Sequence, residues 1–211
     1  RHRFVYSSAS SFMLSAIVQR TTGPTLVDFL PPRLFAPLGI TDVAWDTDSD
    51  GVTSGGNGLS LRTADLAKLG LLYLQQGLWN NQRVLPLSWI SAATSPMQTN
   101  VWMGSFDGRK VLVRDEDDPQ SSGQRYNGYG YHWWTGPDGA FYAWGIFGQY
   151  CIVLPRQNVV IALTGAVGDP ESRLLDLVWA HLVPAVTERE LPARSDQPAT
   201  ALRQRLASLQ L

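Results

Sequence analysis

The sequence is poor in several features that would indicate particular classes of protein. Its single cysteine, Cys151, excludes any disulfide within the chain. It has no run of about 18 apolar residues, so nothing in it indicates a membrane span. The formal net charge of −1 gives no electrostatic support for nucleic-acid binding. The three histidines, His2, His132 and His181, are too scattered in the sequence to indicate a metal site.

Lysine is also scarce, and this bears directly on catalytic motifs. Of the 17 basic residues only Lys68 and Lys110 are lysines, and the residues three positions before them are Asp65 and Asp107. No Ser-x-x-Lys turn therefore exists in the chain. Neither lysine lies in the Gly-Lys-Ser/Thr setting of a P-loop, and the Gly-x-Ser-x-Gly elbow of α/β-hydrolases is absent.

What is present is typical of a folded domain. Hydrophobic residues make up 44% of the 211 residues and charged residues 17%, a balance that does not favour disorder. A chain of this size buries roughly 70% of its unfolded surface on folding. It begins at Arg1, with neither an initiator Met nor an apolar leader. We expect it to be part of a longer gene product.

The first half of the sequence predicts helices. Apolar residues recur with helical spacing and the segments end at glycine or proline. Residues 46–58 contain almost no apolar side chains and predict a long loop. The expected helices run from residue 10 or 11 to residue 20, over 25–30, over 63–77, and briefly after Pro86.

The second half predicts strands, followed by a helix that starts at Ser172. Turn sequences at 136–139 and 155–158 separate segments rich in aromatic and β-branched residues. Residues 115–122 predict a loop, and the polar tail predicts a short amphipathic helix over 200–209. The expected strands cover 129–135, 140–144, 149–154 and 159–164. This order predicts an α+β fold, with an antiparallel sheet flanked by helices and a mainly helical region.

Five phrases, taken in order, resemble the serine β-lactamase and penicillin-binding-protein-like superfamily, in its class C β-lactamase-related hydrolase and esterase branch. The resemblance extends from about residue 4 to about residue 183. Each phrase alone is weak, but their order is that of the family. The phrases are Phe4–Gly23, Leu34–Ile40, Gly55–Gly70, Gly128–Trp134 and Ala143–Gln149.

The resemblance implies that residues 1–183 are the C-terminal part of a serine hydrolase domain and that 184–211 form a polar tail. In the family, the Ser-x-x-Lys turn that supplies nucleophile and lysine precedes the first of these phrases. We therefore expect an upstream N-terminal segment of the same domain as a partner, and expect residues 1–211 alone to be inactive. The resemblance implies no metal and no organic cofactor.

The resemblance assigns two catalytic positions near the N-terminus. Tyr6 matches the tyrosine that relays the proton of the nucleophilic serine, provided that cationic neighbours favour its phenolate. The alternative for Tyr6 is a plain aromatic anchor before a helix. Ser8 takes the third position of the Tyr-x-Asn/Ser element, where class C β-lactamases have Asn. Its hydroxyl reaches less far than an amide and offers fewer hydrogen bonds.

A second element of the family, Lys/His-Thr/Ser-Gly, aligns with Ala143, Trp144 and Gly145. The resemblance makes Trp144, Gly145 and Ile146 the substrate-binding residues, with the Ile146 amide as an oxyanion donor. Ala143 lacks the cation that usually receives a substrate carboxylate, so neutral esters or amides are favoured. For Gly148, a purely structural role in a sharp bend and a role at the site are equal alternatives.

These assignments predict a serine hydrolase that cleaves a small-molecule ester or amide through an acyl-serine intermediate. β-Lactamase, esterase, D-alanyl peptidase and short-amide hydrolase activities all stay open. The alternative is a non-catalytic ligand-binding or sensor protein on the same scaffold, for which Ser8 and Ala143 leave room. Many relatives are exported, which favours a periplasmic or extracellular location, but the sequence itself leaves localisation open.

Overall fold

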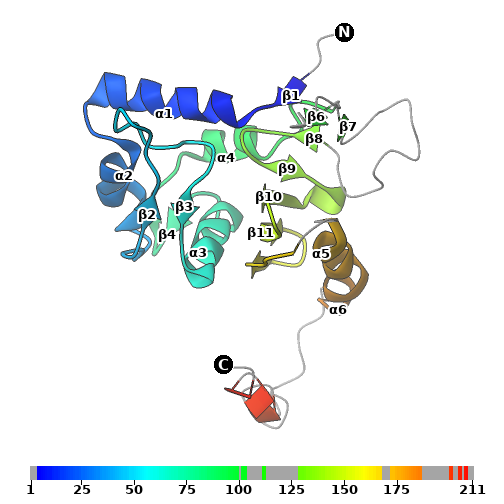
Figure 1. The fold of residues 1–211 in the computed structure, drawn as a ribbon. Coiled ribbons are helices and arrows are strands. Elements are labelled where there is room, and N and C mark those ends of the chain that lie inside the picture. The colour runs from blue at the N-terminus through cyan, green and yellow to red at the C-terminus, as the bar shows by residue number, and fades with distance from the viewer. Residues whose placement is uncertain are drawn as a thin grey trace.

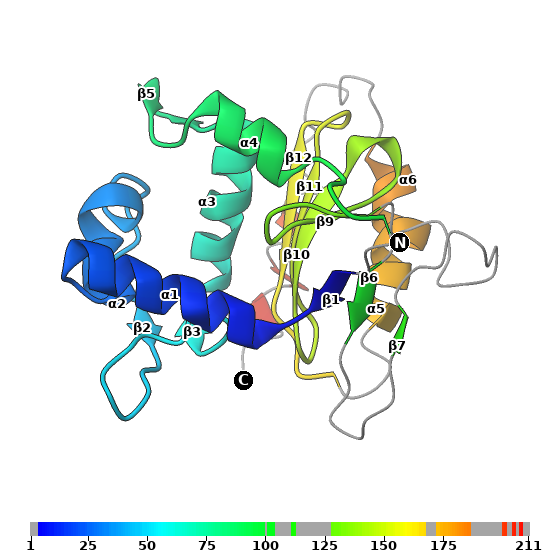
Figure 2. The ribbon, with the colours of Figure 1, turned by 90° about the horizontal axis from the view of Figure 1, so that it is seen from above.

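The computed structural model describes residues 4–99, 101–103, 111–112, 128–167 and 172–186, and in the tail residues 200, 201, 204, 205, 207 and 208. Within these residues a twisted antiparallel sheet lies between two groups of helices (Figures 1 and 2). The helices of the first half lie on one side of the sheet, and α5 and α6 lie on the other. This arrangement and its relatives' folds, reported below, confirm the predicted α+β class.

The main sheet has five strands in the order β12-β11-β10-β9-β8, and every neighbouring pair is antiparallel. Its strands follow one another along the chain, so the sheet is a simple meander. The short 3-10 turn η3, Pro137–Gly139, joins β9 to β10 where the sequence predicts a turn. The strands are β8 (Gly128–Tyr129), β9 (Trp134–Thr135), β10 (Phe141–Gly145), β11 (Gln149–Leu154) and β12 (Val159–Leu163).

Large side chains alternate between the two faces of this sheet, because successive residues of a strand point to opposite sides. One face carries Tyr142, Tyr150 and Ile152, which are fully buried, and it packs against Leu175 and Val178. The other face packs against helix α3 and is formed by Trp133, Phe141, Cys151 and Val153. The sheet is therefore buried on both sides.

The helical region has its own small apolar core. Phe35, Leu38, Ile40 and Leu72 are all at most 3% exposed and pack together there. Helix α1 ends at Gly23, whose φ of 95° is a left-handed conformation that glycine adopts readily. The helices of this region are α1 (Ser8–Thr22), α2 (Leu26–Phe29), the π-helical turn η1 (Pro31–Phe35), α3 (Thr63–Leu74) and α4 (Leu87–Ala93).

The remaining strands form three small sheets. The first residues of the chain enter one of them, where β1 pairs with β6 in parallel and β6 pairs with β7. The other two are short hairpins, β2-β3 and β4-β5. These strands are β1 (Phe4–Tyr6), β2 (Ala44–Trp45), β3 (Leu59–Ser60), β4 (Leu78–Trp79), β5 (Gln82–Arg83), β6 (Val101–Met103) and β7 (Val111–Leu112).

The C-terminal helical segment follows the sheet and covers one of its faces. It is continuous but changes its turn geometry twice, from α5 (Ser172–Leu177) through the π-helical η4 (Val178–Leu182) to α6 (Val183–Ala185). In the tail, helical backbone is present at residues 200, 201, 204, 205 and 207, within the range predicted for a short helix. The loop predicted at 115–122 lies outside the described residues.

Three sequence predictions need correction. The first helix starts at Ser8, two or three residues earlier than expected, directly after the extended Ser7. The third ends at Leu74, because the chain turns through Gly77 at a φ of 82°. The strand predicted over 129–135 is two short strands joined by a turn at Tyr131 and His132, where Gly130 donates to the Trp133 carbonyl at 2.8 Å.

Helix α3 reaches the sheet through a glycine, and this contact yields a stability prediction. A Cβ at Gly70 would lie 2.6 Å from Val160 Cγ1 and 2.7 Å from Cys151 Sγ. In a helix Ala is ordinarily more favourable than Gly by about 1 kcal/mol. Here we expect Gly70→Ala instead to lower the free energy of unfolding, by about 1–3 kcal/mol, because it overpacks the interface.

Urea titration of the protein tests this prediction, with Ala64→Gly as the matched control on the exposed first turn of α3. The control reports helix propensity alone and should cost about 1 kcal/mol or less. A Gly70→Ala variant that is as stable as the parent, or more stable, would contradict the packing described here.

Candidate functional site

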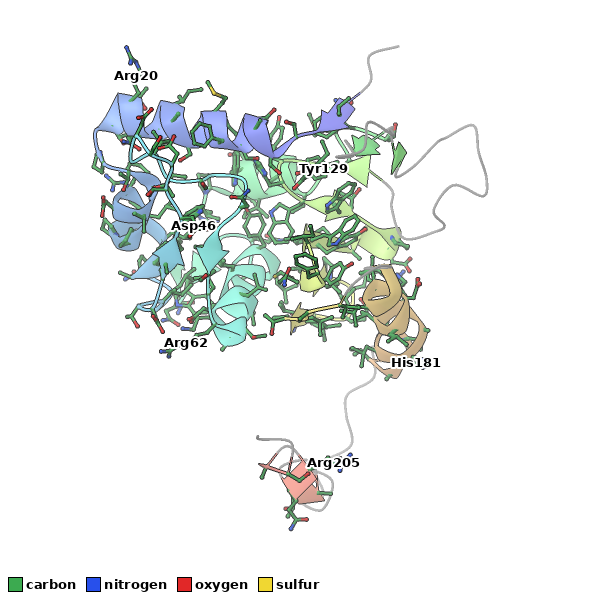
Figure 3. All side chains as sticks on the ribbon, in the orientation of Figure 1. Arg20, Asp46, Arg62, Tyr129, His181 and Arg205 are labelled. Atoms are coloured by element: carbon green, nitrogen blue, oxygen red, sulfur yellow. The ribbon has the colours of Figure 1, made fainter. Side chains whose placement is uncertain are left out.

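Tyr6 lies at the end of β1, where the chain passes from strand to helix. Its ring stacks on Trp134 at a centroid distance of 6.0 Å and meets Tyr129 edge-on at 5.8 Å. Trp134 in turn lies 5.7 Å from Trp144. Figure 3 labels Tyr129 close to β1, among the aromatic side chains of the sheet. One tryptophan ring thus separates Tyr6 from the strand that ends at Gly145.

The surroundings of Tyr6 favour its neutral form. Burial raises the pKa of the Tyr6 phenol above its ordinary value of 10.0. The pKa of Tyr129 is raised as well, first by burial and then by the charge that Tyr6 would carry. Two phenols side by side therefore resist ionisation. A nearby cation would be needed to lower the pKa of Tyr6 toward neutrality.

Ser8 occupies the first turn of α1, two residues beyond Tyr6, and it is exposed. Its backbone packs closely against the loop that carries Gly56, where a Cβ would approach the Ser8 carbonyl oxygen to 2.6 Å. The same loop contacts α1 farther along, since the buried Ser15 hydroxyl donates to the Thr53 carbonyl at 2.6 Å. These contacts fix the start of α1 and hence the position of Ser8.

The other predicted site residues lie where β10 ends and turns into β11. The Trp144 side chain lies on the face of the main sheet against which Tyr6 packs, and both residues contact the same buried cluster. Ala143, which aligns with the family's cation position, lies on the opposite face, against α3. Gly145 is the last residue of β10, and the Ile146 side chain is 61% exposed.

The turn after Gly145 is held in a demanding conformation. Phe147 has a φ of 65°, unusual for a bulky residue, and its side chain is 53% exposed. Its carbonyl accepts a hydrogen bond from Val167 N–H at 3.0 Å. Gly148 has a φ of 92°, and a Cβ there would lie 2.6 Å from Leu174 Cδ1. Gly148 therefore has the structural role that we considered as one of its two alternatives.

A pocket of about 510 Å³ opens beside Tyr6. Its lining comes from β1, the first turns of α1, helix α4 and the turn between β8 and β9. No Lys or Arg is among these residues in the part of the chain that the structure describes. The lining residues are Phe4, Val5, Tyr6, Ser7, Ser10, Ser11, Leu14, Trp89, Tyr129, Gly130, Tyr131 and His132.

The structure thus brings some of the predicted site residues together and leaves others apart. Tyr6 and Trp144 share the aromatic cluster around Trp134. Ser8, Trp144, Gly145 and Ile146 are not among the residues that line the pocket at Tyr6. Within the described residues, ring contacts lead from Tyr6 through Trp134 to Trp144 on β10. They do not reach the exposed turn that follows Gly145.

His132 lines the pocket, and it falls within the segment 129–135 that the sequence predicts to be one strand. It lies instead in the β8–β9 turn with a φ of 62°, at a position that usually takes Gly or Asn. The neighbouring Tyr131 ties this turn to α4, since its N–H donates to the Ala93 carbonyl at 3.0 Å. Burial lowers the pKa of His132, which favours the neutral imidazole. Gly130, a residue type common in turns, was the available signal for a turn in this segment.

The described residues carry no cluster of three or more His, Cys, Asp or Glu side chains arranged to bind a metal ion. Cys151 is buried, and its burial raises the pKa of its thiol to about 12. Among the helices in the described ranges, none has the length and apolar character that crossing a bilayer requires.

The chain is similar to several known proteins and solved structures. A 6-aminohexanoate-dimer hydrolase of Paenarthrobacter ureafaciens is 29% identical over 173 residues, which are 81% of this chain and 41% of the relative. A Bacillus anthracis protein assigned as a 6-aminohexanoate-dimer hydrolase superposes with a TM-score of 0.68 at 21% identity, over 87% of this chain and 44% of that one.

A second solved structure, like the first, bears on the fold alone. An octameric penicillin-binding protein homologue from Pyrococcus abyssi superposes with a TM-score of 0.62 at 18% identity, over 90% of this chain and 45% of that one. The chain therefore spans less than half the length of these three proteins. The model of the Beta-lactamase family matches residues 1–182. Since this match covers most of the sequence, the chain belongs to the Beta-lactamase family.

Proposed function

We propose that this chain forms part of a serine hydrolase that cleaves an ester or amide through an acyl-serine intermediate. The observation that carries the proposal is the position of Tyr6. Its phenol lines a pocket, and its ring lies one tryptophan away from the strand of Trp144 and Gly145. Membership of the Beta-lactamase family supports the reaction class, and the whole protein's activity is part of the proposal.

The proposed reaction has two halves. In the first, a serine hydroxyl attacks the substrate carbonyl, a Ser O–C bond forms, and the bond to the alcohol or amine breaks. The proton leaves the hydroxyl through Tyr6 and is delivered to the departing group. In the second, water attacks the acyl-serine, the acid is released and the serine hydroxyl is restored. Neither half requires a redox partner.

Tyr6 can act as this relay only if its pKa is brought down. Burial alone raises it, and no Lys or Arg is among the described residues that line its pocket. The cation that the relay needs is therefore assigned to a lysine outside residues 1–211, one helical turn from the nucleophile. The Ser8 hydroxyl, two residues from Tyr6, is assigned to hold that lysine or a substrate amide by a hydrogen bond.

The end of β10 is assigned to substrate binding. The Ile146 amide is proposed as an oxyanion donor, a type of interaction whose removal typically costs about 2.7–4 kcal/mol in the barrier. Gly145 leaves the strand edge open to the substrate backbone, and Trp144 supports it from behind. Because Ala143 carries no cation, we propose that the part of the substrate bound at the end of β10 is uncharged. The relatives named as 6-aminohexanoate-dimer hydrolases favour a linear amide.

The complete protein, treated with a fluorophosphonate, should gain one covalent adduct on a serine outside residues 1–211. Activated serines react with this reagent, and no Ser-x-x-Lys lies within the chain. Peptide mass spectrometry locates the adduct. A panel of p-nitrophenyl acetate, a chromogenic cephalosporin, a D-Ala-D-Ala peptide and the linear 6-aminohexanoate dimer then identifies the substrate class.

Two results would overturn the proposal. One is the absence of any serine adduct under conditions that label a control hydrolase. The other is saturable binding of panel compounds without turnover, which would establish a non-catalytic binding or sensor protein instead. An adduct on a serine within residues 1–211 would contradict the assignment of the nucleophile.

Replacing the phenol tests the role of Tyr6. In the complete protein, Tyr6→Phe should lower kcat by about 100- to 10,000-fold with little change in KM, because it removes proton transfer and keeps the ring. The matched control is Tyr73→Phe. Tyr73 does not line the pocket, and its hydroxyl accepts a hydrogen bond at 3.3 Å from Trp89, which does. Steady-state kinetics on the best panel substrate measures both variants. If Tyr6→Phe and Tyr73→Phe were equally active, Tyr6 would act only as an aromatic anchor and not as a proton relay.

A further inference from the structure

The turn that joins β10 to β11 packs against the segment that follows β12, residues 164–167. Val167 of this segment donates its N–H to the Phe147 carbonyl at 3.0 Å. Phe147 directly follows Ile146, whose amide is the proposed oxyanion donor. The 164–167 segment therefore contacts the turn one residue away from that amide.

The two backbones approach each other closely, because glycines lie on both sides of the contact. A Cβ at Gly165 would lie 3.2 Å from the Gly148 carbonyl oxygen and 3.3 Å from the Phe147 carbonyl oxygen. A residue without a side chain permits such an approach. A side chain at Gly165 would push the 164–167 segment away from the turn.

Gln149, the first residue of β11, joins the turn to this segment through its side chain. Its Nε2 donates to the Gly165 carbonyl at 3.0 Å. Since only the nitrogen of an amide can donate to a carbonyl, this contact fixes the orientation of the side chain. Gln149 also pairs with Gly145 in the sheet, and a Cβ at Gly145 would lie 3.2 Å from Gln149 Oε1. One side chain thus contacts both the end of β10 and the 164–167 segment.

The 164–167 segment is itself attached to the rest of the fold. Thr164 Oγ1 forms a hydrogen bond of 2.9 Å with Thr63 Oγ1, at the start of α3. The residue before the segment, Leu163, pairs with the fully buried Tyr150. The segment is therefore held by the main sheet and by α3, and it can act as a fixed support for the turn.

We propose that Gln149 is a positioning residue of the hydrolase. Its side-chain amide holds the 164–167 segment against the β10–β11 turn and so fixes the direction of the Ile146 amide. This inference rests on the proposed function, which assigns that amide to the oxyanion. Donors stabilise a developing charge best when they are already aimed at it, and a misplacement of about 1 Å can cost about 100-fold in rate.

The conformation of Phe147 explains why the turn needs this support. Its φ of 65° is rare for a bulky residue, and such conformations persist only where the surrounding structure imposes them. The hydrogen bonds of Val167 and Gln149 impose it from the same side. Loss of the Gln149 bond leaves the turn freer to relax, and the Ile146 amide then loses its direction.

A purely structural role for Gln149 predicts a different result from a positioning role. A structural bond would affect the stability of the sheet and leave kcat of the folded protein nearly unchanged. A positioning role lowers kcat and leaves KM nearly unchanged, because the contact with the oxyanion is made in the transition state. Kinetics of the folded protein therefore distinguishes the two.

Gln149→Met in the complete protein tests the proposal, since it keeps the length of the side chain and removes the donor. We expect kcat on the best panel substrate to fall about 10- to 100-fold, with KM within about threefold of the parent. The inhibition constant of phenylboronic acid should rise by a similar factor, because its tetrahedral serine adduct uses the same oxyanion donor. The matched control is Ile152→Val, a small loss of packing on the same strand away from the turn, which should keep kcat within about threefold.

Hydrogen exchange of the Val167 amide reads the contact independently of activity. This amide is bonded to the Phe147 carbonyl, so it should exchange at least about 10-fold faster in Gln149→Met than in the parent. Mass spectrometry of overlapping peptides measures the rate. Gly165→Ala is the second variant, for the case in which Gln149→Met does not fold, and it should change kcat and exchange in the same directions.

Faster exchange together with the expected fall in kcat supports the proposal. A Gln149→Met variant whose kcat stays within threefold of the parent overturns it, and so does an unchanged exchange rate at Val167. A fall in kcat without weaker boronate inhibition also overturns it. If the parent protein forms no serine adduct, the proposed function fails and the catalytic role of Gln149 fails with it, whereas the exchange rates still show whether Gln149 holds the turn.

Discussion

The structure depends on the way Trp134 joins two distant parts of the chain. Its indole contacts Tyr6 from the first strand, Tyr129 from the neighbouring strand and Trp144 from β10. These rings fill the space between the N-terminal segment and the main sheet with large, rigid surfaces that lose little conformational entropy on packing. The role proposed for Tyr6 depends on this cluster, because it sets how far the ring of Tyr6 lies from β10.

The sequence predicted the meander well, for a reason that can be seen in β10 and β11. Neighbouring residues of each strand point to two different buried faces, as Phe141 and Tyr142 do in β10 and Cys151 and Ile152 do in β11. Turns rich in Gly, Pro and Asn separate the strands. Such local patterns can be recognised without the structure. The parallel pairing of Phe4 with Val101 could not be, because a register between residues so far apart leaves no local signal.

The candidate site was less predictable. Family resemblance directed attention to Tyr6, but the raised pKa that comes from burial among Trp134 and Tyr129 depends on tertiary packing. His132 was misplaced because the aromatic residues on either side resemble a continuous strand, whereas the hydrogen bond of Tyr131 to Ala93 requires a turn. The exposed face of α1 also escaped prediction, since Phe12, Leu14, Ile17 and Val18 have the spacing of a helix packed on its own chain.

The position of β12 at the end of the five-strand order has a consequence for handling the chain. Its residues, Val159 to Leu163, are all apolar, and within the described residues its outer edge has no neighbouring strand. Proteins usually guard such margins with charge, proline or a covering element. We therefore expect a preparation of residues 1–211 to be prone to intermolecular strand pairing at this edge.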